Sequence, residues 1–181
     1  KNNHYGNFWA IGAMWKLKQE NFLKDVKWLS DLNLRFSTGL SGNALGGYNH
    51  ITTIKPDNFY QSKTAYTVGR LGNPDLRWEE QRKTTVGLNL VVDRGTSFNI
   101  EYYDRETYDM ISSRDLNSTT GQVQFYDNAG GMRNRGVDFT FSSVVYRSKN
   151  QDLTIRPYFN VNYNKQEVTA LFGNKTSNVI P

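Results

Sequence analysis

Strict alternation of apolar and polar residues is the feature that most constrains this chain. In one stretch, Leu32, Leu34 and Phe36 are separated by Asn33 and Arg35. Successive side chains of a β-strand point to opposite faces, so this pattern predicts a strand with one apolar face and one polar face. The same alternation recurs over residues 9–17, 85–92, 98–103, 137–142 and 153–163. Together with residues 32–41, these stretches predict an all-β fold of six strands, several of them longer than the usual five or six residues.

The connections between the predicted strands alternate in length. Residues 93–96 (Asp-Arg-Gly-Thr) have the composition of a tight hairpin turn, and residues 148–151 form another short connection. Residues 43–77 and 113–132 are long, polar and rich in glycine, whereas residues 18–30 are intermediate and have room for a helical turn. In an antiparallel up-and-down meander, this order places the long loops at one end of the sheet and the short turns at the other.

Two architectures satisfy this pattern. In a soluble sandwich, the apolar face of each sheet packs on a core. In a transmembrane barrel, lipid contacts the apolar face and a polar lumen contacts the other. Long strands and alternating loop lengths favour the barrel, but the charged residues Arg35, Glu101, Asp138 and Arg156 suit a lumen and a sandwich exterior equally well. Periodicity alone leaves both architectures open.

Composition and spacing argue against several kinds of chemistry. The 181 residues include no cysteine, which excludes disulfides and thiolate catalysis. The two histidines, His4 and His50, have no second metal ligand at a recognised spacing. The net charge of +5 comes from interspersed residues, so no nucleic-acid patch is indicated. Glu79 and Glu80 are adjacent and would point to opposite faces of a strand, so they cannot form a catalytic carboxylate pair. We therefore expect neither an enzyme nor a cofactor.

Four segments carry longer motifs. They read LNLRFSTGLSGN at residues 32–43, GNPDLRWE at 72–79, YYDRETYDMI at 102–111, and NAGGMRNRGV at 128–137 after a TG pair at 120–121. In this order, they resemble the motifs of SusC/RagA-type TonB-linked outer-membrane proteins. That family usually has an acid after the last motif, and Asp138 stands there in this chain.

The resemblance implies a fold and a function. Members of the family have a plug, a TonB box and a barrel of about 22 strands, so residues 1–181 would be part of the barrel domain, without plug or TonB box. The implied function is import of glycans or other large nutrients through the outer membrane of a Bacteroidetes-like Gram-negative bacterium. The implied partners are the rest of the barrel and plug, a SusD-like lipoprotein, the TonB complex and membrane lipid. The alternative is a secreted β-sandwich module that binds glycans.

Two groups of residues are candidates for functional contacts. Polar residues expected on the lumen face are Arg35, Asn89, Glu101, Asp138, Arg156 and Asn160. They could line a transport path or contact the plug. Aromatic residues of the two long loops could stack on sugar rings, or could pack the loops against each other or a lipoprotein. These are Tyr48, Phe59, Tyr60, Tyr66, Phe125 and Tyr126. Residues 73–75 (Asn-Pro-Asp) are expected to form a turn, and Pro157 is expected to cause a bulge or irregular pairing within a strand.

Overall fold

The computed structural model describes residues 5–44, 49–60, 63–92, 95–117, 124–150 and 153–171. These residues form strands and a single short helical turn. In chain order they are β1 (Trp9–Lys16), η1 (Leu17–Gln19), β2 (Leu29–Asn43), β3 (Thr53–Tyr60), β4 (Lys63–Arg70), β5 (Glu79–Val92), β6 (Thr96–Asp115), β7 (Gln124–Ser142), β8 (Tyr146–Arg147), β9 (Thr154–Ile155) and β10 (Tyr158–Ala170). None of the helical structure in the described residues is long or apolar enough to cross a membrane.

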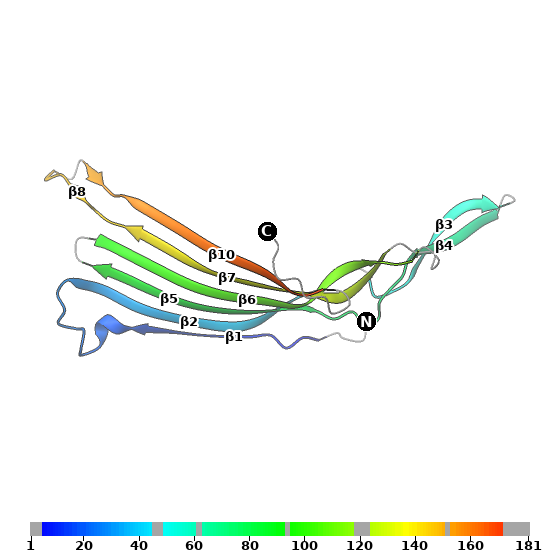
Figure 1. The fold of residues 1–181 in the computed structure, drawn as a ribbon, viewed down its shortest axis with the longest axis horizontal. Helices are drawn as coiled ribbons and strands as arrows, with labels where there is room; N and C mark the ends of the chain where they lie inside the picture. Colours follow the sequence, from blue (N-terminus) through cyan, green and yellow to red (C-terminus); the bar gives the residue numbers. More distant parts are fainter. Residues whose placement is uncertain are drawn as a thin grey trace.

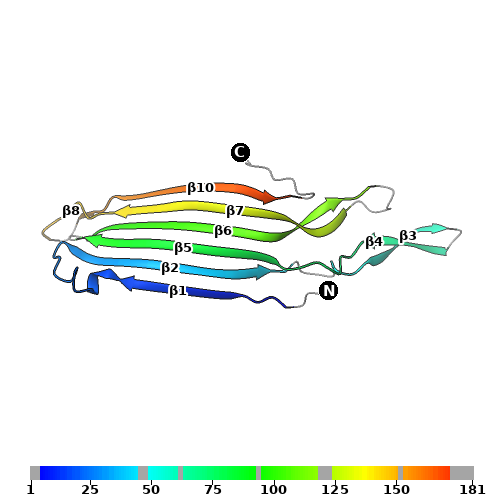
Figure 2. The ribbon, with the colours of Figure 1, turned by 60° about the horizontal axis from the view of Figure 1, so that its bottom comes forward.

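Six of the strands form one antiparallel sheet in the order β1-β2-β5-β6-β7-β10. Apart from two inserted hairpins, β3–β4 and β8–β9, the order in space follows the order in sequence. Figures 1 and 2 show the sheet as a single curved layer, and in the described part of the chain no second layer covers either face. The prediction of an all-β up-and-down meander is therefore confirmed.

The strands extend well beyond the alternating stretches. β6 has 20 residues and β7 has 19, so much of the predicted loop over residues 113–132 is paired strand. The predicted loop over 43–77 contains the β3–β4 hairpin, which lies at the far right in Figure 1. The polar sequence of these segments predicted loops, because the two strands of a hairpin can pair with each other without an apolar face where they project beyond the main sheet.

The prediction of one continuous strand over residues 153–163 is wrong. Thr154 and Ile155 pair with β8 in a separate two-stranded sheet, and β10 begins only at Tyr158. Pro157 has no N–H to donate to the ladder, and the irregular pairing expected there takes the form of a complete break between Ile155 and Tyr158. Its carbonyl oxygen accepts a hydrogen bond from the Ser143 nitrogen at 3.2 Å, which starts the β8–β9 hairpin.

The turn between β5 and β6 is as short as predicted. Gly95 has a φ of +76°, a left-handed conformation that glycine adopts without a steric penalty. The first two residues of the predicted turn, Asp93 and Arg94, lie outside the described residues.

The register separates the side chains into two faces, because directly opposed residues of an antiparallel pair point to the same side of the sheet. One level of the first face, here called the polar face, runs across the sheet through Met14, Arg35, Gly87, Glu101, Asp138 and Asn162. The neighbouring level of the other face, here called the apolar face, runs through Trp15, Leu34, Leu88, Ile100, Phe139 and Val161. The apolar side chains remain uncovered: Trp15 is 50% exposed and Val161 43%.

Candidate functional site

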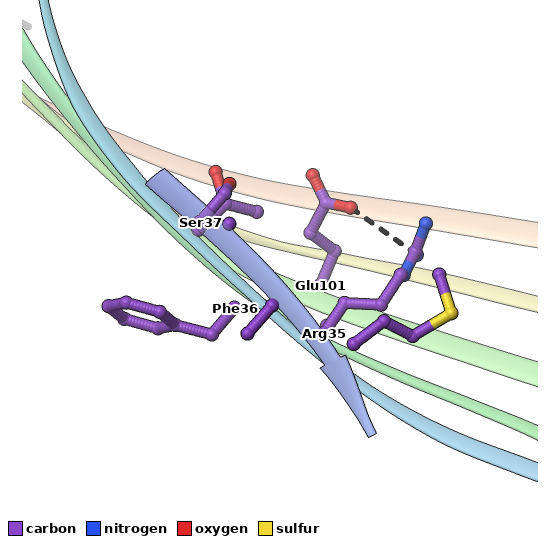
Figure 3. Close-up of a pocket in the computed structure, with 9 residues that line it drawn as sticks. Arg35, Phe36, Ser37 and Glu101 are labelled. Atoms are coloured by element: carbon purple, nitrogen blue, oxygen red, sulfur yellow. Dashed lines mark ion pairs between the residues drawn. The ribbon is translucent and has the colours of Figure 1, made fainter. Parts of the chain in front are cut away.

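At the centre of the polar face, the side chain of Arg35 on β2 reaches across β5 to contact residues of β6. The register places Gly87 between Arg35 on β2 and Glu101 on β6, and a Cβ atom on Gly87 would lie only 3.3 Å from the guanidinium Nη2. Glycine therefore leaves the path open. Nη2 of Arg35 donates a hydrogen bond to Oδ1 of Asn99 at 3.2 Å and lies 3.7 Å from Oε2 of Glu101. Figure 3 shows Arg35 and Glu101 on one side of the sheet, with the Phe36 ring pointing the other way.

A shallow hollow of about 360 Å³ surrounds this ion pair. Met14, Ser37 and Thr85 line it beside Arg35 and Glu101. The side chains of Arg35 and Glu101 keep 43% and 32% of their accessible surface, so the charges remain within reach of a partner. The hollow thus presents a cation, a carboxylate and the Ser37 hydroxyl group at one position of an otherwise extended sheet.

Tyr103 repeats the same arrangement two strands further along the sheet, reaching from β6 over β7 to β10. The register sets it opposite Gly136, and its hydroxyl donates a hydrogen bond to Oδ1 of Asn164 on β10 at 3.2 Å. A Cβ atom on Gly136 would overlap that hydroxyl. The guanidinium carbon of Arg105 lies 4.8 Å from the centre of the Tyr103 ring. Tyr103 is consequently only 7% exposed, although the sheet has no second layer above it.

Amide side chains occupy the level next to Arg35 and Glu101. Asn33, Asn89 and Asn99 oppose one another across β2, β5 and β6, and Asn160 lies at the same level on β10. Each amide offers donors and an acceptor, so the row suits ligands or protein surfaces that carry both.

Several buried polar atoms on this face have no hydrogen-bond partner among the described residues. They are Oδ1 of Asn33, Oγ1 of Thr85, Nε of Arg105 and Oδ1 of Asn134. A buried polar group without a partner costs about 1–3 kcal/mol. These atoms, spread over several levels of the polar face, therefore favour contacts between this face and a further protein segment or a ligand.

Most of the polar residues singled out in the sequence share this face. Arg35, Asn89, Glu101, Asp138 and Asn160 point to the same side of the six-stranded sheet. Asp138 also accepts a hydrogen bond from the amide of Asn162.

Arg156 is the exception. It lies between β9 and β10, outside the six-stranded sheet, because the chain leaves the sheet at Pro157. Its expected place among the lumen-facing residues was inferred from an uninterrupted strand that the structure does not contain.

Sequence reasoning did not single out Gly87, Asn99, Tyr103 or Gly136 as parts of the site. Alternation places Asn99 and Tyr103 on the same face as Glu101, and this signal could have found them. The roles of Gly87 and Gly136 depend on register, which the sequence pattern does not supply.

The six candidate aromatic residues do not form one cluster in the described structure. Tyr48 lies outside the described residues, as do the side chains of Phe59 and Tyr60, whose backbones belong to β3. Tyr66 lies in β4 and is 66% exposed. Phe125 and Tyr126 belong to β7, which corrects their expected place in a loop.

Residues 72–79 act as a clamp between the β3–β4 hairpin and the far ends of β6 and β7. Asn73 is 7% exposed, its Nδ2 donates to the carbonyl oxygen of Tyr126 at 3.0 Å, and its Oδ1 accepts from the Asp75 nitrogen at 3.0 Å. The backbone nitrogen of Asn73 donates to the Asn49 carbonyl at 3.0 Å, at the base of the hairpin. The turn expected at residues 73–75 thus has a structural role.

The side chain of Asn128 completes the clamp. Its Oδ1 accepts from the Arg77 nitrogen at 2.7 Å, while its Nδ2 donates to the Arg77 carbonyl at 3.1 Å and to the Asp109 carbonyl at 2.7 Å. Asp109 has a φ of +51°, a strained conformation at which the β6–β7 register shifts. Two of the sequence motifs, at 72–79 and 128–137, therefore hold each other in place.

A single-layer antiparallel meander with one apolar and one polar face is a segment of barrel wall. The sequence pattern of the family described as "TonB dependent receptor-like, beta-barrel" matches residues 1–181. The chain belongs to the TonB-dependent receptor family and is a SusC/RagA-type segment of its β-barrel.

Individual relatives agree with this assignment. The chain is 31% identical to the TonB-dependent receptor SusC of Bacteroides thetaiotaomicron over 187 residues, which cover 98% of the chain and 18% of SusC. It is 32% identical to a TonB-dependent receptor of Formosa agariphila over 94% of the chain and 16% of that receptor. Among solved structures, the RagAB peptide transporter matches 97% of the chain and 19% of its own chain, with a TM-score of 0.87 and 33% identity. The chain thus spans less than a fifth of the curated relatives it matches.

Proposed function

We propose that the chain is a stretch of wall in an outer-membrane importer for large nutrients, with its apolar face in lipid and its polar face lining the lumen. Glycans and peptides are the two cargo classes that fit, since the amide row and the Arg35–Glu101 pair can hydrogen-bond to hydroxyl groups and to peptide groups. A SusD-like lipoprotein at the surface and the TonB complex below are the proposed partners. The RagAB structures, described as those of a peptide transporter and importer, support the peptide alternative.

This proposal rests on the difference in polarity between the two faces of the sheet at neighbouring positions of the same strands. On the polar face, Arg35, Glu101 and Asp138 lie at the same level of the sheet. One residue along each strand, the apolar face carries Phe36, Tyr102 and Val137. An arginine near the bilayer midplane costs about 2–4 kcal/mol, so only one orientation of this sheet is compatible with a membrane. The β-sandwich alternative needs a second sheet on the apolar face, and the described chain has none.

Adjacent substitutions on β5 test the proposal in the full-length protein. Leu88→Arg places a cation in the proposed lipid face, and we expect loss of the folded, heat-modifiable band on gels of outer-membrane fractions. Asn89→Arg is the matched control, because it adds the same charge one residue away on the polar face, and it should assemble normally. Equal damage by both variants, or harmless assembly of Leu88→Arg, would contradict the proposed orientation.

Cargo class is tested with the assembled protein. Cells that express the full-length importer are supplied with either oligosaccharides or peptides as the limiting nutrient, with and without the neighbouring lipoprotein. Growth that depends on the importer and on the lipoprotein for one cargo class supports the proposed function. Growth on both classes that is independent of the importer would refute it.

A further inference from the structure

Charged residues replace apolar ones on the apolar face toward the long-loop end of the sheet. The level that follows Val86 and Tyr102 carries Asp104, Arg135 and Lys165 on β6, β7 and β10. The next level toward the long loops is also charged, with Arg82, Glu106, Arg133 and Glu167. We call these residues the charged belt: Arg82, Asp104, Glu106, Arg133, Arg135, Lys165 and Glu167. They point to the same side of the sheet as the side chains that we place in lipid.

The height of the belt follows from strand geometry. On β5 the apolar face runs from Val92, next to the short turn, to Val86, with Thr84 following. The eight residue steps from Val92 to Thr84, at about 3.4 Å each and tilted by about 40°, span roughly 21 Å. The apolar zone of such barrels is about 25 Å tall. The belt therefore begins where the hydrocarbon ends, on the side of the long loops, which is the outer leaflet.

The belt residues pair across strands. Arg82 lies 2.9 Å from Glu106, and Nε of Arg133 donates to Asp104 at 3.0 Å. Glu167 is shared, since its Oε2 lies 2.7 Å from Arg135 and its Oε1 lies 2.6 Å from Lys165. Four basic residues thus face three acids. The excess positive charge falls at Arg135 and Lys165, and the Lys165 side chain keeps 50% of its surface exposed.

Fold stability alone does not account for this belt, because exposed ion pairs of this kind contribute only about 0–1 kcal/mol each. Phosphate groups are the anions that occupy the outer headgroup layer at this height, and arginine binds phosphate through two parallel hydrogen bonds. Tyr102 and Tyr163, exposed by 42% and 65%, lie at the level just below, where aromatic side chains contact the membrane interface.

We infer that the charged belt binds the phosphorylated headgroup of lipopolysaccharide in the outer leaflet, with Arg135 and Lys165 as the principal contacts. The inference rests on the proposed membrane orientation. It predicts that lipopolysaccharide stabilises the folded barrel through these two cations.

The test uses the full-length protein in phosphatidylethanolamine vesicles, with or without added lipopolysaccharide. The measured quantity is the gain in the temperature at which the heat-modifiable band disappears. Arg135→Gln combined with Lys165→Gln should lose most of this gain. Lys83→Gln is the matched control, since Lys83 lies at the height of the belt but on the polar face, and it should retain the gain.

Glu167→Gln separates headgroup binding from a purely structural role. It breaks the same two ion pairs but leaves both cations, so it should retain the gain from lipopolysaccharide. An unchanged gain in the double variant, or an equal loss in Glu167→Gln, would overturn the inference, as would an equal gain from phosphatidylglycerol. A wild-type protein with no heat-modifiable band at all would instead refute the barrel assignment on which the inference rests.

Discussion

Gly136→Ala should destabilise the barrel far more than Gly87→Ala, although both glycines lie on the polar face beneath a crossing side chain. The Cβ atom of alanine at position 136 would overlap the Tyr103 hydroxyl and lie 2.5 Å from the carbonyl oxygen of Tyr163. The first contact can be relieved only if the ring moves, and the second involves backbone of the paired strand. At position 87, the nearest atom is the end of the flexible Arg35 side chain, at 3.3 Å.

The magnitude follows from three contributions. Overpacking costs about 1–3 kcal/mol. Loss of the hydrogen bond from Tyr103 to Asn164 costs about 1 kcal/mol. Replacing a strand glycine by alanine returns roughly 0.5–1 kcal/mol in both variants. We therefore expect Gly136→Ala to lower the free energy of unfolding by about 2–3 kcal/mol, and Gly87→Ala to leave it nearly unchanged.

The assay is urea unfolding of the full-length protein in detergent micelles or vesicles, followed by the gel shift of the folded band. Tyr103→Ser removes the ring, so the combined variant Tyr103→Ser/Gly136→Ala should be more stable than the sum of the two single effects predicts. Equal stability of the two alanine variants would refute the crossing arrangement. Strict additivity in the double variant would show that Tyr103 does not lie over Gly136.

Two further predictions concern the ends of the sheet. Asn128→Ala removes three hydrogen bonds of the clamp, to Arg77 and Asp109, and should make residues 72–79 sensitive to limited proteolysis while the folded band remains; Asn162→Ala, on the polar face, is the control and should leave cleavage unchanged. Lys18→Met should speed amide hydrogen exchange in residues 20–27 by roughly tenfold, because the Lys18 ammonium donates to the carbonyls of Leu23, Lys24 and Val26 at 3.0, 2.9 and 2.7 Å. Lys24→Met should not change that exchange, and equal effects of the two substitutions would show that the carbonyl contacts do not hold the turn.

The alternating stretches predicted the six strands because a barrel wall has lipid on one face and a polar lumen on the other, so its strands must alternate apolar and polar residues. In β2, for example, Leu32, Leu34 and Phe36 face one side of the sheet, whereas Asn33 and Arg35 face the other. The ends of the long strands were missed for the same reason. Beyond the apolar zone, both faces of β6 and β7 tolerate polar residues, so residues 124–132 were predicted as part of a loop although they are paired strand.

The details of the polar face depend on register, which arises from pairing between distant parts of the chain. Arg35 and Asn99 are 64 residues apart, and their contact requires Gly87 between them. No local pattern links these three positions. The break at Pro157 was underestimated because a proline in an alternating stretch is compatible with either a bulge or the end of a strand, and only the pairing partners of residues 153–155 distinguish the two.

The opposite environments of the two faces can be measured directly by spin labels placed singly at consecutive positions of β5, from Thr85 to Leu90, in the full-length protein in vesicles. Oxygen dissolves in lipid and a charged nickel complex in water, so the relaxation that each causes reports what surrounds each label. The account predicts that oxygen accessibility peaks at 86, 88 and 90 and that nickel accessibility, where the plug leaves the lumen open, peaks at 85, 87 and 89, with the two profiles out of phase. Profiles in phase, or nickel accessibility at Leu88 equal to that at Asn89, would contradict the assignment of the apolar face to lipid.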